Sequence, residues 1–78
     1  MKNIKVLGTG CAKCDMLYDN VKKVADDMGL DYELEKVQDI MKITEFGVMM
    51  TPALVVDGEV KVSGKVPKDD ELKDIISD

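Results

Sequence analysis

Two cysteines are the residues of this 78-residue sequence whose chemistry is easiest to state. They enclose the segment Cys11–Cys14, which reads Cys-Ala-Lys-Cys and follows a Gly-Thr-Gly run. On the first turn of a helix, positions three apart share one face, so two sulfur atoms there can form and break a disulfide with little backbone movement. Two thiolates at this spacing can also hold a soft metal ion such as Cu(I). The pair therefore predicts one of these two kinds of chemistry.

The two sulfur atoms are expected to differ in reactivity. Unpaired N–H groups and the positive end of the helix dipole favour a thiolate at a helix start, and Lys13 adds a positive charge. We therefore expect a lowered pKa for Cys11, tuned in part by Lys13, and a less exposed sulfur for Cys14. In this interpretation Cys11 attacks a disulfide and Cys14 resolves the mixed disulfide that results.

Composition excludes several other kinds of function. Histidine is absent, which removes the Ser-His and Cys-His nucleophile arrangements and the commonest metal ligand. A net charge of −5 argues against nucleic acid as a partner. No apolar run approaches the roughly 20 residues that span a bilayer, and no signal-peptide pattern is present. We expect a cytoplasmic protein with no membrane partner.

The elements that position the cysteines follow from hydrophobic periodicity. The apolar run 4–7 predicts a buried strand that ends just before the cysteines. Apolar residues at positions 17, 21, 24 and 28 predict a helix that Gly29 ends, and alternation over 30–37 predicts an edge strand. Asp39 is expected to cap a short helix. The apolar residues expected to face inward from this helix are Ile40, Ile43 and Phe46.

The second half of the chain predicts a hairpin and a last helix. The run Ala53–Val56 is apolar throughout, as in a central strand covered on both faces. Asp57-Gly58 is a strong turn signal, and Val60 and Val62 alternate with charged residues, as in an edge strand. Positions 69–76 predict a final helix with acidic residues in its first turn.

These elements predict an α/β fold with the order βαβαββα, in a single domain over residues 1–78. The helical segments between the first three strands favour parallel pairing, and the tight turn makes the fourth strand antiparallel to the third. Placing the charged strands at the edges predicts a four-stranded mixed sheet of order 2-1-3-4. Helices are expected on both of its faces.

Two motifs in this order resemble the thioredoxin-fold superfamily. They are the segment Gly8–Cys14 after the first strand and the segment Met50–Gly58, which contains Thr51-Pro52, before and through the hairpin. The similarity is greatest to the small, glutaredoxin-sized thioredoxins of archaea and bacteria, also described as redox-active disulfide proteins, and it spans nearly the whole chain. It implies a thiol-disulfide oxidoreductase that reduces protein disulfides and uses no cofactor beyond its own Cys11–Cys14 pair.

The resemblance also implies roles for other residues. Pro52 is expected to follow a cis peptide bond and to face the cysteine pair, while the backbone of Thr51 pairs with a substrate peptide like an added strand. Gly10 and Met50 are predicted to contact substrate beside them. The implied partners are disulfide-containing proteins and an electron donor of the thioredoxin reductase type.

Some features differ from larger thioredoxins or leave alternatives open. The first strand has no acidic residue that could accept a proton behind the second cysteine. The Gly-x-x-Cys-x-x-Cys pattern also fits copper chaperones, but those proteins have the order βαββαβ and end on a strand. Met16 and Met28 are expected to fill the core. Met49 and Met50, next to Pro52, predict either an apolar contact patch for partner proteins or simple packing.

Overall fold

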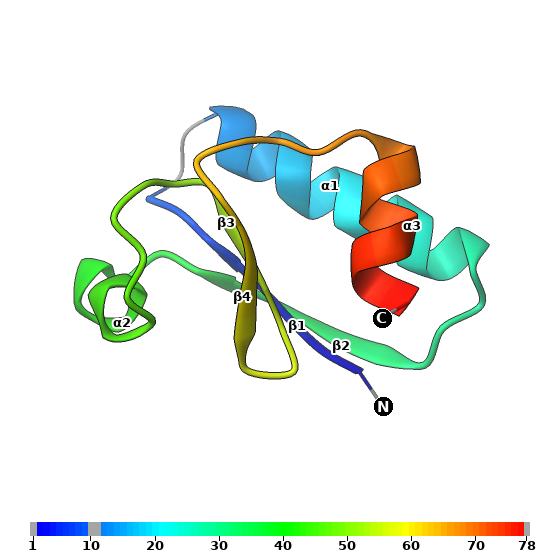
Figure 1. Cartoon of the computed structure of the whole chain (residues 1–78), viewed down its shortest axis with the longest axis horizontal. Coiled ribbons are helices and arrows are strands. Elements are labelled where there is room, and N and C mark those ends of the chain that lie inside the picture. Colours follow the sequence, from blue (N-terminus) through cyan, green and yellow to red (C-terminus); the bar gives the residue numbers. More distant parts are fainter. Residues whose placement is uncertain (1, 10–11, 78) are drawn as a thin grey trace.

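The computed structural model describes residues 2–9 and 12–77, with strands and helices in the predicted order βαβαββα (Figure 1). Each element lies close to the range that its hydrophobic pattern predicts. The elements are β1 (Lys2–Leu7), α1 (Ala12–Asp27), β2 (Tyr32–Val37), α2 (Ile40–Glu45), β3 (Ala53–Val56), β4 (Glu59–Ser63) and α3 (Asp69–Ser77).

The four strands form a mixed sheet of order β2-β1-β3-β4, as predicted. β1 and β2 are parallel, with Leu7 opposite Val37 at their carboxyl ends. β3 lies between β1 and β4, and all four of its residues are buried. The strands with charged faces, β2 and β4, therefore form the two edges.

The predicted direction of the third strand is wrong. β3 runs antiparallel to β1, with Leu7 opposite Ala53, and β4 runs antiparallel to β3. β1 and β2 run parallel, so β3, which is antiparallel to β1, begins at the end of the sheet where β2 stops. The connection of 15 residues, 38–52, is long enough for either direction, so its length does not predict which one the chain takes.

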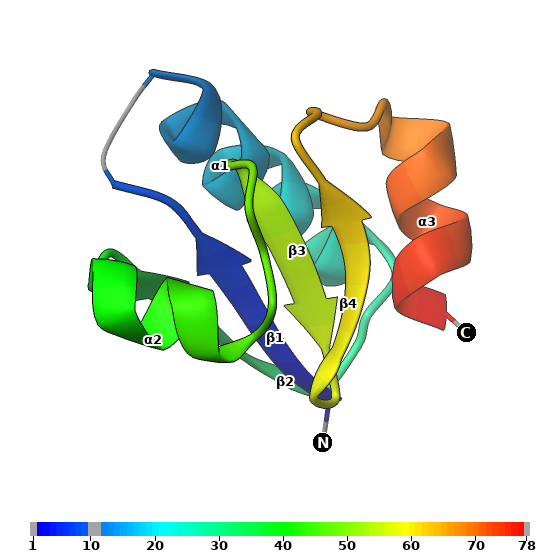
Figure 2. The same ribbon diagram turned by 60° about the vertical axis from the view of Figure 1, so that its left-hand side comes forward.

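Helices cover both faces of the sheet, as predicted. In Figures 1 and 2, α1 and α3 lie side by side on one face and α2 lies on the other. The larger core fills the space under α1 and α3, and a smaller core lies under α2. The larger core consists of Ile4, Val6, Leu17, Val21, Val24, Leu54, Val56, Val62, Leu72 and Ile76.

The buried face of α1 follows the predicted spacing, with one exception. Leu17, Val21 and Val24 are buried, and Met28 is partly buried against the same core. Met16 was expected to fill the core, but its side chain is 56% exposed. It precedes Leu17 by one position, about 100° around the helix, and so lies beside the buried face rather than on it.

The short helix α2 begins where the sequence predicts. The Asp39 side chain caps it by accepting a hydrogen bond from the Met41 backbone N–H at 2.9 Å. Ile43 is buried and Phe46 is partly buried in the smaller core. Ile40 was expected to face inward, but it is 66% exposed. A helix of only six residues buries its middle turn, and its first residue stays in solvent.

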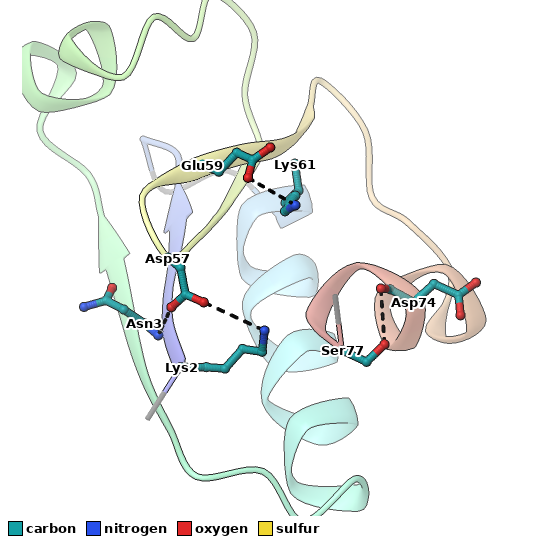
Figure 3. A network of polar contacts seen from close by, with 7 residues as sticks. All are labelled: Lys2, Asn3, Asp57, Glu59, Lys61, Asp74 and Ser77. Atoms are coloured by element: carbon teal, nitrogen blue, oxygen red, sulfur yellow. Dashed lines mark hydrogen bonds and ion pairs between the residues drawn. The ribbon is translucent and has the colours of Figure 1, made fainter.

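The hairpin turn also holds the start of β1 (Figure 3). Asp57 and Gly58 have φ values of 52° and 83°, as the two central residues of a type I′ turn require. The Asp57 backbone N–H donates to the Asn3 carbonyl oxygen at 2.7 Å, and the Asn3 N–H donates to Asp57 Oδ1 at 2.9 Å. Lys2 Nζ lies 3.8 Å from Asp57 Oδ2. The turn is therefore linked to β1 by backbone and side-chain contacts.

A bulge in β4 changes the predicted alternation. Leu54 pairs with Val62 but Val55 pairs with Val60, so one extra residue, Lys61, stands between them. Val60 and Val62 consequently face opposite sides of the sheet. Val62 is buried in the larger core, whereas Val60, expected on the same face, is 37% exposed.

Replacement of Asp57 tests the link between turn and strand. Asp57→Ala removes the acceptor for the Asn3 N–H and places a residue that disfavours positive φ, so we expect a loss of about 1–2 kcal/mol in unfolding free energy. Asp57→Asn keeps an acceptor oxygen and tolerates positive φ, and it should lose less than about 0.5 kcal/mol. Urea unfolding measures both. Equal losses would mean that the exposed ion pair with Lys2 supplies the stability instead.

A second link joins β2 to the end of α1 and predicts a change in stability at alkaline pH. The Tyr32 hydroxyl donates to Asp26 Oδ1 at 2.7 Å, and this hydrogen bond raises the pKa of Tyr32 above its ordinary value of 10.0. The folded protein therefore holds this proton more tightly than the unfolded chain. The resulting stabilisation is fully present below about pH 10 and decreases as the pH rises further.

We expect the urea midpoint of the natural protein to fall more steeply than that of Tyr32→Phe between about pH 9 and pH 11. The phenylalanine variant keeps the ring but has no proton to lose. Between about pH 7 and pH 9 the two midpoints should run parallel, which serves as the internal control. Parallel midpoints over the whole range would contradict a raised Tyr32 pKa.

Candidate functional site

Cys14 lies on the first turn of α1, directly after the loop that leaves β1. Cys14 is only 1% exposed. Gly10 and Cys11, the predicted substrate contact and nucleophile, lie outside the described residues. Lys13 is exposed on the same turn as Cys14. The described part of the candidate site therefore consists of Cys14 and the segments around it.

Gly8 determines how closely this turn approaches the sheet. Its backbone N–H donates to the Val37 carbonyl oxygen at 2.9 Å, which extends the pairing of β1 and β2 by one residue. A Cβ atom at Gly8 would collide with Cys14 Sγ and would lie 2.8 Å from Cys14 Cβ. Because Gly8 has no side chain, the sulfur of Cys14 can occupy this space. The sequence places Gly8 in a loop, but gives no sign of this contact.

The peptide bond between Thr51 and Pro52 is cis, which confirms the expectation from the resemblance. Pro52 is buried and Thr51 is exposed. The carbonyl oxygen of Pro52 accepts a hydrogen bond from the Gly64 N–H at 2.9 Å. The segment before β3 is therefore held to the end of β4.

Met50 makes two further contacts with the end of β4. Its carbonyl oxygen accepts a hydrogen bond from Ser63 Oγ at 3.2 Å. Its side chain lies against Gly64, where an added Cβ would be 3.1 Å from Met50 Cβ. Met50 is nevertheless 63% exposed and Met49 is 97% exposed, so simple packing does not account for either side chain. The segment presents two thioethers to solvent from a fixed backbone.

The sheet brings Cys14 and this segment to the same end of the molecule. Pro52 precedes Ala53, and Ala53 pairs with Leu7, the last residue of β1. Gly8 follows Leu7 directly and lies against Cys14. Figure 2 shows the loop that enters β3 beside the start of α1. Cys14 and the Thr51-Pro52 segment therefore lie at the same end of the sheet, although 36 residues stand between Cys14 and Thr51 in the sequence.

An ion pair beside Cys14 was not anticipated. Lys36 Nζ on β2 donates to Asp15 Oδ1 on α1 at 2.7 Å, and it lies 4.9 Å from the centre of the Tyr18 ring. The hydrogen bond to Asp15 raises the pKa of Lys36 above 10.5, so its positive charge persists into alkaline solution. Alternation along β2 could have predicted that Lys36 faces α1, because Tyr32 and Leu34 lie on the same side of the strand and pack against the larger core.

Two other properties bear on the class of protein. Over residues 2–9 and 12–77, no three His, Cys, Asp or Glu side chains gather where they could hold a metal ion. In the same part of the chain, no helix is both long and apolar enough to cross a membrane. Cys11 lies outside these residues, so Cu(I) binding by Cys11 and Cys14 stays a prediction.

Comparison with known proteins agrees with the fold. Residues 2–77 match the family described as Thioredoxin domain. A thioredoxin of Methanothermobacter thermautotrophicus is 42% identical over 77 residues, which cover 99% of this chain and all of that protein. A thioredoxin of Methanocaldococcus jannaschii is 41% identical over 71 residues, which cover 91% of this chain and 81% of that protein. The chain therefore belongs to the thioredoxin family, whose members are thiol-disulfide oxidoreductases.

Proposed function

We propose that this protein reduces protein disulfides through Cys11 and Cys14, with Cys11 as the nucleophile and Cys14 as the resolving cysteine. The observation that supports this assignment best is the burial of Cys14 against Gly8 on the first turn of α1. A buried second sulfur is poorly placed to attack a large substrate. It is well placed to attack a disulfide formed by a neighbouring residue of its own chain.

The proposed reaction has two exchange steps. The Cys11 thiolate attacks one sulfur of a substrate disulfide, and the other substrate sulfur leaves as a thiolate. The Cys14 thiolate then attacks Cys11 Sγ in the mixed disulfide and releases the second substrate sulfur. Two electrons have passed to the substrate, and the protein holds a Cys11–Cys14 disulfide. A dithiol on an electron donor of the thioredoxin reductase type restores the reduced pair by the same exchange.

The proposed substrate groove lies along the segment before β3. Exposed Thr51 is positioned to offer its backbone to an extended peptide, and buried Pro52 fixes the segment beside it. The thioether of Met50 adds an apolar contact that adapts to different side chains. Gly10 is proposed to leave room for the peptide near Cys11. The proposal includes Lys13 as a source of positive charge near the thiols, no bound cofactor and a cytoplasmic location.

Trapping of the intermediate tests the order of the two cysteines. Cys14→Ser removes the resolving thiol, so we expect mixed disulfides with substrate proteins to accumulate through Cys11 and to disappear on reduction. Gel electrophoresis without reductant, followed by mass spectrometry of the linked peptides, measures them. Cys11→Ser should trap few or none, because buried Cys14 is hard to reach.

The same variants distinguish disulfide exchange from soft-metal binding. If the pair instead holds Cu(I), each single variant should lose the bound metal of the natural protein, and Cys14→Ser should trap no protein partner. Predominant trapping by Cys11→Ser would reverse the proposed roles. Absence of trapping by both variants would contradict disulfide exchange.

The contact between Gly8 and Cys14 gives a separate test of the site's geometry. Gly8→Ala places a methyl group where Cys14 Sγ lies, and we expect the unfolding free energy to fall by about 1–3 kcal/mol. In a Cys14→Ala background the sulfur is gone, so the same change should cost less. Urea unfolding of the four proteins gives the coupling between the two positions. Equal costs in both backgrounds would show that the sulfur atom does not cause the loss, which would then come from the contact with Cys14 Cβ.

A further inference from the structure

We infer that Asp15 and Lys36 are positioning residues that together set the dithiol-disulfide equilibrium of the cysteine pair. Each charge cancels the other beside the first turn of α1, so the reactive sulfur atoms experience little net charge from the two. This inference rests on the proposed function, because it assumes that Cys11 and Cys14 form a reversible disulfide.

The contact itself is close and partly shielded. Lys36 Nζ and Asp15 Oδ1 are 2.7 Å apart, which is a short charge-assisted hydrogen bond. The Lys36 side chain is 29% exposed and passes over the face of Tyr18, which holds its charge in a defined place. The Asp15 side chain is 56% exposed, so only the Lys36 end of the pair is partly shielded from water and salt.

Both members of the pair adjoin residues that define the environment of Cys14. Asp15 follows Cys14 directly on α1. Lys36 precedes Val37, whose carbonyl oxygen accepts the Gly8 N–H, and Gly8 is the residue against which the Cys14 sulfur lies. The pair therefore joins β2 to the helix turn that contains Cys14.

Other charges near the pair are few in the part of the chain that is described. On α1, Asp19 also attracts Lys36 from one turn further along the helix, and Lys13 is exposed on the first turn. Neither replaces Asp15 as the hydrogen-bond partner of Lys36. Removal of one member of the pair should therefore leave a net charge beside the cysteines.

The two single changes should have opposite effects. Asp15→Asn leaves the Lys36 charge uncancelled, which stabilises a thiolate and so favours the dithiol form. Lys36→Met leaves the Asp15 charge uncancelled, which disfavours a thiolate and so favours the disulfide. Asparagine can still accept a hydrogen bond from Lys36, and methionine keeps an apolar stem over Tyr18. The shape of the site is thus largely kept while its charge changes.

The experiment is an equilibrium titration against reduced and oxidised dithiothreitol, read by thiol alkylation. Dithiothreitol gives two electrons and two protons to the Cys11–Cys14 disulfide and becomes its cyclic disulfide. The constant for this reduction should rise about two- to fivefold in Asp15→Asn and fall by a similar factor in Lys36→Met. The double variant, with no charge at either position, should return close to the natural value. Lys36→Arg keeps the charge and should also stay close to it.

A second ion pair provides the matched control. Lys23 on α1 and Asp69 on α3 lie 3.8 Å apart, and Lys23 follows Cys14 by nine residues, about 13 Å along the helix. Lys23→Met and Asp69→Asn change the net charge by the same amounts as the test variants. They should leave the constant unchanged, which separates a local effect from a change in total charge.

The outcomes separate the inference from the proposed function. If the natural protein forms no intramolecular disulfide at any ratio of dithiothreitol, the proposed function fails and the inference with it. If it titrates normally, but the two single variants shift in the same direction or no more than the Lys23 and Asp69 controls, the inference alone is wrong. A common shift would mean that the pair only anchors the helix, and a common loss of thermal stability would accompany it.

Discussion

The approach of α1 to the end of β1 is the constraint on which the larger core and the site both depend. Gly8 has no side chain, so the first turn of the helix can lie directly on the strand with the Cys14 sulfur between them. From that turn, the helix extends along the sheet and buries Leu17, Val21 and Val24 against the strands. A side chain at Gly8 would press on Cys14 and lift the helix at its start, which would open this core beside the proposed site.

Local patterns were enough to predict most of the fold. The run Ala53–Val56 identified a central strand because a strand covered on both faces has no position for a polar residue. The charged face of β2 identified an edge strand, because charged side chains can stay in contact with solvent there. The direction of β3 could not be obtained in this way. The connection of residues 38–52 is long enough for either direction, so neither the hydrophobic pattern nor the length of the connection determines it.

The sequence predicts those residues of the candidate site that belong to a recognisable motif. It does not predict contacts between residues that only the folded sheet brings together. Cys14 and Pro52 belong to motifs that can be recognised in any sequence. The contact of Gly8 with Cys14, the ion pair of Lys36 with Asp15 and the position of Met50 against Gly64 involve residues brought together by the sheet. The sequence does not predict the bulge at Lys61. Alternation of residue types indicates which face a side chain occupies, but only where the strand is regular.

That bulge has a consequence for how the molecule behaves among copies of itself. A straight edge strand exposes a row of backbone donors and acceptors that a strand from another molecule can join. In β4 the extra residue interrupts this row after two pairs, and the bend it introduces twists the rest away from a common plane. Glu59 and Lys61, paired at 3.4 Å, add charge beside the interruption. The edge at β4 is thereby less open to pairing with a strand from another molecule.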